Sequence, residues 1–287
     1  MSKSERRSVP PRRFGPPYNP GMPLEDTHPD FVTSLARGID VLLAFTSSTP
    51  EMTLSEVAAK TGLTAATVRR SLLTLAALGY VRQNGRRFVL TARVLQLGAA
   101  FVESMNLNEV AQIYLQELVD VFHDASSLTM LDGNDVVYVV HIPSNRPARL
   151  RQHVGARMPA HGSSTGYVLL GSLPDGELEA YLRQAPFPAF TPKTPVSSDA
   201  LRAHCLAARE NGFGIAQDAI GLGTIAIAVP VHDQHGRVLA AINCSADSTK
   251  ITREKLIETR LAPLQRAAQR ISEQLIRYPA LTASSPR

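Results

Sequence analysis

The fold is decided by the stretch from residue 53 to residue 90, which reads TLSEVAAKTGLTAATVRRSLLTLAALGYVRQNGRRFVL. Thr53 precedes an apolar run and Glu56 follows three residues later, which is the spacing of a capping box at a helix start. This spacing predicts a short helix over residues 54–60. The helix is expected to end at Thr61-Gly62, because glycine readily adopts the left-handed conformation found after helix ends.

A second helix start follows this glycine at once. Thr64 is a favourable N-cap residue, and apolar residues recur on one helical face from Ala65 to Ala77. Two helices joined by a turn of about three residues that contains glycine have the spacing of a helix-turn-helix. An apolar stripe over residues 31–46 predicts a third helix upstream of the pair.

A hairpin signal comes after the second helix of the pair. The apolar period falls to two residues, and Asn84-Gly85 separates two strand-like runs at 80–83 and 86–90. Asn-Gly is favoured at the centre of a type I′ turn, because both central residues of that turn need positive φ. Three helices followed by a basic hairpin predict a winged helix-turn-helix over residues 31–91.

The net charge of +5 is concentrated in this same part of the chain. Residues 31–95 contain eight Lys and Arg against three Asp and Glu, whereas residues 96–287 contain seventeen against eighteen. A basic module attached to a near-neutral one favours a polyanionic partner. We therefore expect the first module to bind double-stranded DNA.

The second helix of the pair is expected to enter the major groove, while the wing reaches the backbone or the neighbouring minor groove. The residues expected to lie near base edges and phosphates are Thr64, Ala65, Ala66, Thr67, Arg69 and Arg70 on the helix and Arg86 and Arg87 in the wing. For either helix arginine, the alternative is a solvated side chain that makes no DNA contact.

Composition excludes several protein classes. No run approaches eighteen apolar residues, so the 44% hydrophobic content fits soluble cores and no membrane span is expected. Cys205 and Cys244 cannot form a disulfide framework and no secretory signal precedes them, so we expect the reducing cytoplasm. His141, His153 and His161 lack metal-ligand spacing, so neither a metal nor another cofactor is expected.

The rest of the sequence divides by composition and period. Residues 1–30 are rich in proline and arginine and predict a disordered arm, and residues 279–287 predict a flexible tail. A linker helix is expected over 92–107 and a second domain over 108–278. Within that domain we expect helices at 108–124, 163–172, 175–185, 198–210 and 252–277, and strands at 127–131, 136–140, 149–154, 214–217, 225–231 and 238–244. Helices interspersed with antiparallel strands predict an α+β fold.

Five blocks of sequence occur in order along the chain: FVTSLARGIDVLLAF (31–45), LSEVAAKTGLTAATVRRSLLTLAALGYV (54–81), NGRRFVLTARVLQLG (84–98), VGARMPAHGSSTGYVLLG (154–171) and IAIAVPVHDQHGRVLAAINCS (225–245). Together they resemble the IclR family of bacterial transcription regulators, from Phe31 to Ile276. The segment SLARGIDVLLAF is most similar to the branch that regulates catabolism of aromatic acids such as protocatechuate, 4-hydroxybenzoate and terephthalate.

The resemblance implies a transcriptional regulator rather than an enzyme. Its N-terminal winged domain would bind operator DNA, and its C-terminal GAF-like domain would bind a small organic acid as effector. The family also implies a homodimer or a dimer of dimers on palindromic DNA. RNA polymerase is considered as a further partner. A ligand would then shift the population of dimer arrangements and so the spacing of the two recognition helices.

The resemblance also implies an effector site over the sheet of the second domain. Its residues would be Ser163, Ser164, Thr165 and Gly166 at a helix start and Ala226, Asn243 and Ser245 in the last strands. Unpaired N–H groups and the dipole at a helix start favour a carboxylate, which supports the first group independently. The stretch 217–223 reads QDAIGLG and has only Asp218 where several acidic residues are usual in the family, so ligand identity is not transferred from relatives.

Two arginines and one histidine are further candidates for the same site. Arg149, Arg151 and His153 alternate along one face of the strand expected at 149–154, where one of them could pair with a carboxylate. The alternative is that this face lies in solvent. Arg157 is expected to brace the following loop rather than to contact the ligand.

Two other function classes are compatible with parts of the sequence. Gly162-Ser163-Ser164-Thr165-Gly166 matches G-x-S-x-G, so a serine hydrolase would use Ser164 with His235 and either Asp218 or Asp233. Against this, residues 157–160 read as a proline loop rather than a buried parallel strand. A DNA-binding architectural protein without a ligand would not need the 192 residues that follow the basic segment.

Overall fold

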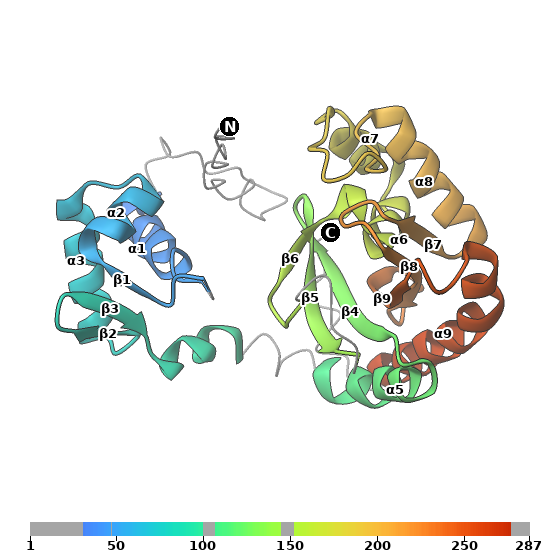
Figure 1. Cartoon of the computed structure of the whole chain (residues 1–287), viewed down its shortest axis with the longest axis horizontal. Helices are drawn as coiled ribbons and strands as arrows, with labels where there is room; N and C mark the ends of the chain where they lie inside the picture. Colours follow the sequence, from blue (N-terminus) through green and yellow to red (C-terminus); the bar gives the residue numbers. More distant parts are fainter. Residues whose placement is uncertain (1–30, 47, 100–106, 145–151, 277–287) are drawn as a thin grey trace, which may run out of the picture. The chain divides into compact units, whose positions relative to one another are not determined.

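The computed structural model describes residues 31–46, 48–99, 107–144 and 152–276. The chain forms two compact units, residues 1–101 and 102–287 (Figure 1). The arm expected at 1–30 and the tail expected at 279–287 lie outside the described residues, so these assignments stay predictions.

The first unit contains three helices and a three-stranded antiparallel sheet in the order β1-β3-β2. Its elements are α1 (Thr33–Leu43), β1 (Glu51–Thr53), α2 (Leu54–Thr61), α3 (Ala65–Ala77), β2 (Val81–Asn84), β3 (Arg87–Leu90) and the 3-10 turn η1 (Ala92–Val94). The predicted helices and wing are confirmed. Strand β1 was not expected, because three residues with one buried side chain, Met52, leave no recognisable alternation.

The predicted helix caps are present at α2 and α3. The N–H of Glu56 donates to Thr53 Oγ1 at 3.3 Å, and the N–H of Thr53 donates to Glu56 Oε2 at 2.7 Å. Gly62 follows α2 with φ +70, the left-handed conformation that its position requires. The N–H of Thr67 donates to Thr64 Oγ1 at the start of α3. These caps fix both ends of the turn between the two helices.

The turn of the wing differs from the predicted type I′ turn. Asn84 pairs with Arg87, so the two loop residues are Gly85 and Arg86. Of these residues only Gly85 has positive φ, at +58. A single positive φ at the first central position is the requirement of a type II′ turn. The prediction that Asn84-Gly85 forms the centre of the turn is therefore wrong by one residue.

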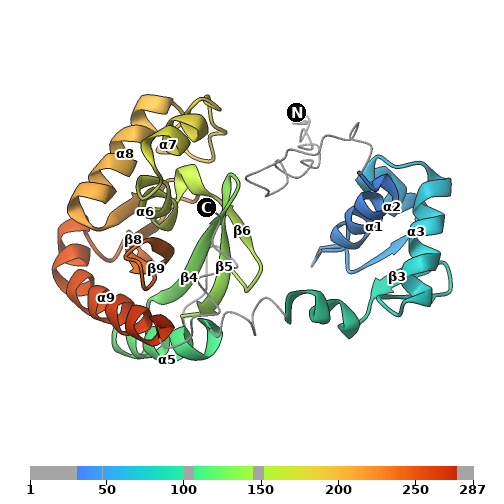
Figure 2. The same ribbon diagram turned by 180° about the vertical axis from the view of Figure 1, so that it is seen from behind.

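The second unit is a six-stranded antiparallel sheet with helices on both faces (Figures 1 and 2). Its elements are α5 (Leu107–Phe122), β4 (Ala125–Asp132), β5 (Asp135–Ile142), β6 (Arg157–Pro159), the 3-10 turn η2 (Ala160–Gly162), α6 (Ser164–Gly171), α7 (Asp175–Leu182), α8 (Ser198–Asn211), β7 (Gly214–Gln217), β8 (Thr224–His232), β9 (Val238–Asp247) and α9 (Arg253–Ile276). The strand order is β6-β5-β4-β9-β8-β7. The predicted α+β fold is confirmed.

Alternating side chains of the strands build two cores in this unit. On β8, Ile225, Ile227 and Val229 join the apolar cluster of α5 and α9. Ala228 on the same strand and Ala241 on β9 join the cluster of α6, α7 and α8. The period of two along each strand therefore assigns one face of the sheet to α5 and α9 and the other to α6–α8.

The strand expected at 149–154 is not formed in its described part. Residues 152–154 are loop and turn, and the N–H of Ala156 donates to the carbonyl of His153. The edge strand is β6, which the sequence had suggested to be a proline loop. Pro159 is tolerated there because an edge strand has one side without partners. Arg157 is a brace, but of the β4–β5 turn rather than of the loop that follows it, since it donates to the carboxylates of Asp132 and Asp135.

The linker helix expected over 92–107 begins with η1 and continues as helix over residues 95–99. Residues 100–106 lie outside the described part of the chain, and α5 begins at Leu107. Among the helices of the described ranges, none is both long enough and apolar enough to span a bilayer.

Candidate nucleic-acid interface and ligand site

The first turns of α3 present an exposed basic surface. Ala65, Ala66, Arg69 and Arg70 are all exposed, and neither arginine has an ion pair within the described residues. The hydroxyls of Thr64 and Thr67 lie 2.9 Å apart and form the cap, so their orientation is fixed. Small residues allow a helix to approach the DNA closely. The guanidinium groups that follow them can donate hydrogen bonds to phosphates or to base edges.

The two wing arginines have different surroundings. Arg87 Nη1 donates to the carbonyl of Glu51 at 3.1 Å and lies 3.5 Å from Glu56 Oε2. Arg87 therefore braces β3 against β1 and the start of α2. Arg86, at the second position of the turn, is exposed and has no such partner among the described side chains. The sequence could not distinguish the two, because the contacts of Arg87 come from residues more than thirty positions away.

In the second unit, the sheet face that packs against α6 has a polar centre. We call Ser127, Thr129, Tyr138, His141 and Asn243 the sheet-face cluster. In the strand register, Ser127 on β4 pairs with both His141 on β5 and Asn243 on β9, and Thr129 pairs with Tyr138. Directly paired residues of neighbouring strands share a face. Thr129 also pairs with Ala241, which packs in the core of α6–α8, so this face is the one toward α6.

Two members of the sheet-face cluster are buried without a hydrogen-bond partner. Thr129 Oγ1 and Asn243 Oδ1 have none within the described parts of the chain, although their residues are 0% and 6% exposed. A buried polar atom left unpaired costs about 1–3 kcal/mol, so a polar ligand that pairs with it gains that contribution. A polar ligand bound in this part of the second unit would supply the missing hydrogen bonds to these two atoms.

The surroundings of the His141 imidazole favour its neutral form. Ser127 Oγ lies 2.9 Å from His141 Nδ1. Desolvation, and then the nearby His153, lower the pKa of His141 below its usual value. Tyr138 accepts a hydrogen bond from Gln152 at 2.9 Å through its hydroxyl. The polar groups on this face are therefore uncharged donors and acceptors.

The start of α6 has the predicted polar residues, with one correction. Ser163 is the N-cap, and its Oγ accepts from the N–H of Gly166 at 3.0 Å. Ser164 and Thr165, also buried, occupy the first two helical positions. A Cβ on Gly166 would overlap the carbonyl of Ala160, so Gly166 serves the packing of α6 on η2. Because its N–H already donates to Ser163 Oγ, Gly166 does not offer the free backbone donor suggested by the sequence.

The remaining predicted effector residues are brought together only in part. Ala226 pairs with Ser245, and Ser245 shares a strand face with Asn243 two residues earlier. His153 is exposed and lies in a turn rather than on a strand. Arg149 and Arg151 lie outside the described residues.

Sequence reasoning missed Ser127, Thr129 and His141. They lie in strands that were interpreted only as parts of the sheet, and their grouping depends on pairing between β4, β5 and β9. The available signal was the polar content of Ser126-Ser127-Leu128-Thr129 within a strand of a buried sheet.

The surroundings of Ser164 differ from those of a hydrolase nucleophile. The helix that starts with Ser164 follows a 3-10 turn, and every strand pairing in its unit is antiparallel. The carboxylate of Asp218 accepts from backbone N–H groups of its own loop, and so does that of Asp233. The described residues also contain no group of three His, Cys, Asp or Glu side chains able to hold a metal ion.

Comparison with known proteins identifies both units. Residues 34–85 match the IclR helix-turn-helix domain, and residues 99–273 match the C-terminal domain of the bacterial transcriptional regulator IclR. The chain is 37% identical to the Pca regulon regulatory protein of Pseudomonas putida over 243 residues, which cover 84% of this chain and 83% of that protein.

Solved structures agree with this assignment. The putative transcriptional regulator RHA06195 from Rhodococcus sp. RHA1 is 39% identical, with a TM-score of 0.76 over 85% of this chain and 98% of that one. A double mutant of the PobR inducer-binding domain from Acinetobacter, in complex with 3-hydroxybenzoic acid, is 29% identical. Its TM-score is 0.53, over 57% of this chain and 96% of that one. The chain belongs to the IclR family of bacterial transcriptional regulators.

Proposed function

We propose that this regulator binds operator DNA through α3 and the wing, and that a small aromatic acid bound in the second unit controls this binding. The observation that supports the proposal most is the contrast between the two sites. Arg69 and Arg70 are exposed without ion pairs in the described part of the chain, whereas Thr129 and Asn243 have buried polar atoms without partners. The first arrangement suits a polyanion, and the second suits an enclosed small molecule.

At the DNA, the first turns of α3 would lie in the major groove. Thr64, Ala65, Ala66 and Thr67 would lie near base edges, and Arg69 and Arg70 would contact bases or phosphates. Arg86 would contact a phosphate, since its side chain is free of partners in the described structure. Arg87 would contribute mainly by holding the wing in place.

At the effector site, the carboxylate would approach the start of α6. The N–H groups of Ser164 and Thr165 belong to the first helical turn, where backbone donors point outward and the dipole favours an anion. The ring and its substituents would then face the sheet-face cluster. Ser163, Ala226, Asn243, Ser245, His153, Arg149 and Arg151 are retained as proposed neighbours of the ligand. The hydroxybenzoic acid bound by the related inducer-binding domain supports an aromatic acid here.

The regulator is proposed to act as a homodimer or a dimer of dimers. Val32, Leu35, Ile39 and Leu43 form one stripe along α1 at helical spacing and are 46–63% exposed. An uncharged aliphatic stripe of this kind is self-complementary about a two-fold axis. A two-fold dimer would match a palindromic operator. RNA polymerase is retained as a proposed further partner, and the cytoplasm as the proposed location.

Ligand binding tests the effector part of the proposal. Unfolding of the full chain is followed by fluorescence with and without benzoate, 3-hydroxybenzoate, 4-hydroxybenzoate, protocatechuate and terephthalate. An acid present at about 100 times its Kd should add about 2.7 kcal/mol to the free energy of unfolding. If every acid leaves unfolding unchanged at millimolar concentration, the aromatic-acid effector is refuted.

An ester assay tests the remaining enzymatic alternative. Wild type and Ser164→Ala are compared for hydrolysis of 4-nitrophenyl acetate. Equal background rates are expected from the regulator, because no histidine is hydrogen-bonded to Ser164 among the described residues. A burst of nitrophenol that the substitution removes would establish the hydrolase instead.

A further inference from the structure

Three segments far apart in sequence surround the start of α6. They are η2 before the helix, the loop 186–196 between α7 and α8, and the loop 218–223 between β7 and β8. His161 of η2 is 3% exposed and stacks on Phe187 and Phe190, with ring centroids 5.0 and 5.7 Å apart. Its Nε2 lies 3.0 Å from the carbonyl oxygen of Pro188. These contacts join η2 to the first half of the loop 186–196.

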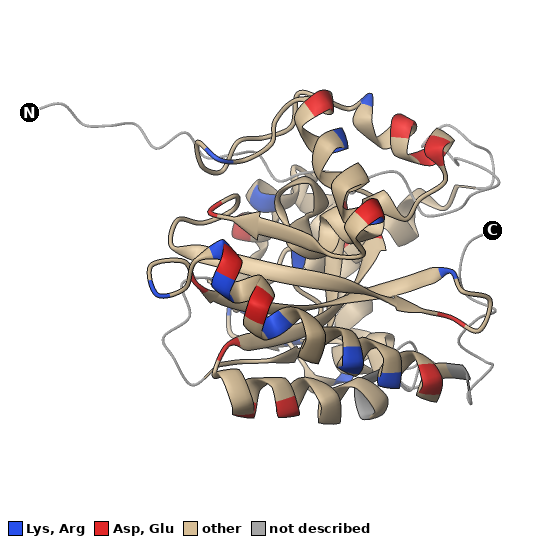
Figure 3. Ribbon diagram, turned by 90° about the vertical axis from the view of Figure 1, so that its right-hand side faces the viewer, with Lys and Arg blue, Asp and Glu red and all other residues tan. Residues whose placement is uncertain are grey.

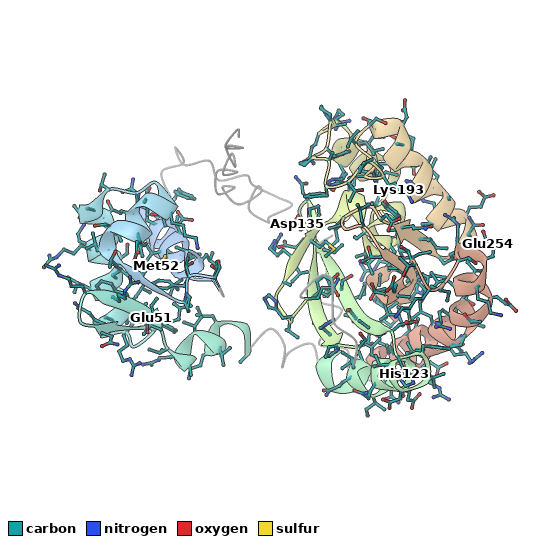
Figure 4. The ribbon with its side chains drawn as sticks, viewed as in Figure 1. Glu51, Met52, His123, Asp135, Lys193 and Glu254 are labelled. Atoms are coloured by element: carbon teal, nitrogen blue, oxygen red, sulfur yellow. The ribbon has the colours of Figure 1, made fainter. Side chains whose placement is uncertain are left out.

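The second half of that loop is tied to Asp218 and its neighbour. Thr191 Oγ1 donates to the carbonyl of Asp218, and Thr194 Oγ1 donates to the carbonyl of Ala219, each at 2.5 Å. Lys193 Nζ lies 2.9 Å from Asp218 Oδ2. Lys193 is labelled in Figure 4, on the side of the unit that contains α7. Two hydroxyls and one ammonium group therefore hold the loops together.

Asp218 also organises its own loop. Its Oδ1 accepts from the N–H of Gly223 at 2.7 Å, from the N–H of Thr224 at 3.2 Å and from Ser248 Oγ at 3.0 Å. Its φ is +57, a conformation that is uncommon for residues other than glycine and that aspartate tolerates. The hydrogen bond from Lys193, the backbone N–H of Gly223 and Ser248 together keep the pKa of Asp218 below its usual value.

Ile220 connects the loop 218–223 to the segment that precedes α6. A Cβ built on Gly162 would lie 2.7 Å from Ile220 Cγ1, so the isoleucine packs directly on the backbone of η2. Gly162 immediately precedes Ser163, the N-cap of α6. A displacement of the loop 218–223 would therefore reach the first turn of α6 through one side chain.

We propose that Asp218 is a positioning residue for the effector site. With Lys193, Thr191 and Thr194 it forms a latch that fixes the start of α6, so that the N–H groups of Ser164 and Thr165 are oriented before a carboxylate arrives. This inference rests on the effector site proposed above. A pre-oriented site binds more tightly because less ordering accompanies binding.

The test measures the order of α6 and ligand affinity separately. Amide hydrogen exchange of peptides covering 160–166 and 187–194 is measured on the full ligand-free chain, and titration calorimetry gives the Kd of 3-hydroxybenzoate. The variants are Asp218→Ala, Asp218→Asn and Lys193→Met. Asp233→Ala is the matched control, because Asp233 is likewise buried and likewise caps a loop through two backbone N–H groups, in the β8–β9 turn.

Asp218→Ala should raise exchange of 160–166 about tenfold by releasing the segment locally, and should weaken 3-hydroxybenzoate binding by a similar factor. Asp218→Asn keeps an acceptor and tolerates positive φ, so it should recover part of both effects. Asp233→Ala should lower the melting temperature and change neither readout.

Unchanged exchange of 160–166 in Asp218→Ala, or an equal change in Asp233→Ala, would overturn the latch. If Asp218→Ala does not fold, Lys193→Met and Asp218→Asn replace it. Raised exchange of 160–166 in either variant supports the latch, and unchanged exchange in both overturns it. Should wild type bind none of the aromatic acids while Asp218→Ala still loosens 160–166, the effector proposal fails and the latch on α6 is upheld.

Discussion

The first turns of α3 and the sheet-face cluster differ in how they are built. The residues expected to contact DNA lie within positions 64–70, are largely exposed and, unlike Val68 between them, have no role in the core of their unit. The sheet-face cluster comes from three strands, and all its members except His141 are buried. A surface that meets DNA can be altered with little effect on folding. A site inside a sheet domain cannot, because its residues are also part of the packing.

Charge separates the two regions as well. In the view of Figure 3, acidic and basic residues are mixed along the helices of the second unit. The exposed arginines of α3 have no acidic neighbours in ion-pairing distance within the described chain. Substitutions of Arg69 and Arg70 should therefore change DNA affinity alone, and substitutions around α6 should change stability and ligand binding together.

The largest expected effect concerns the packing of α6. Gly166→Ala should lower the free energy of unfolding by about 3 kcal/mol, because the new methyl group overlaps the backbone carbonyl of Ala160. The measurement is urea unfolding of the full chain. Gly176→Ala is the control, since a Cβ there meets nothing within 4 Å, and it should be neutral or slightly stabilising. Equal stability of the two variants would contradict the close packing of α6 on η2.

The next effect concerns the recognition helix. Arg69→Ala and Arg70→Ala should each weaken binding to a selected DNA sequence by about 10- to 100-fold if the guanidinium reads a base. Fluorescence anisotropy at fixed salt measures this, with DNA selected from a random pool by the wild-type chain. The melting temperature and the Kd of 3-hydroxybenzoate should stay unchanged. Less than threefold loss for both variants would mean that α3 does not read the sequence.

A smaller effect is expected at the capping box of α2. Thr53→Ala removes the acceptor for the N–H of Glu56 and should cost about 1 kcal/mol of stability in the first unit. Thr74→Ala, at an exposed position within α3, is the control and should stay within about 0.5 kcal/mol of wild type. Both are measured by urea unfolding followed by circular dichroism. A Thr53 variant as stable as the control would show that the cap contributes little.

The smallest effect separates the two wing arginines. Arg86→Ala should weaken binding evenly across DNA sequences and reduce the slope of log affinity against log salt by about 1, as expected for one lost phosphate contact. Arg87→Ala should mainly lower stability, by less than about 1 kcal/mol, because its ion pair with Glu56 is half exposed. A larger change of salt slope for Arg87→Ala than for Arg86→Ala would reverse these roles.

Local patterns were sufficient to predict the first unit. The capping box at Thr53, the N-cap at Thr64 and the glycine after α2 each act over three or four residues, and all three are present. The pattern placed the wing correctly but shifted its turn by one residue. The cause is that the pairing of Asn84 with Arg87 depends on strand register, which the pair Asn-Gly alone does not fix.

Pairing over long distances limited the prediction of the second unit. The pairing of Ser127 with His141 and Asn243 could not be predicted, because these residues lie on three strands and up to 116 positions apart. The predicted polar start of α6 is present, but Gly166 serves packing. Nor could the sequence reveal that Asp218 joins two loops, since its partners Lys193 and Ser248 lie 25 and 30 positions away.

The most direct measurement is the DNA affinity of the full chain with and without a bound aromatic acid. The selected DNA should be bound at least about 10³-fold more tightly than a scrambled sequence. A saturating acid should change that affinity by about 5- to 150-fold, and the DNA should change the affinity for the acid by the same factor. DNA binding without sequence preference, or a selected-DNA affinity that no acid alters, would contradict a regulator in which one unit reads DNA and the other senses a metabolite.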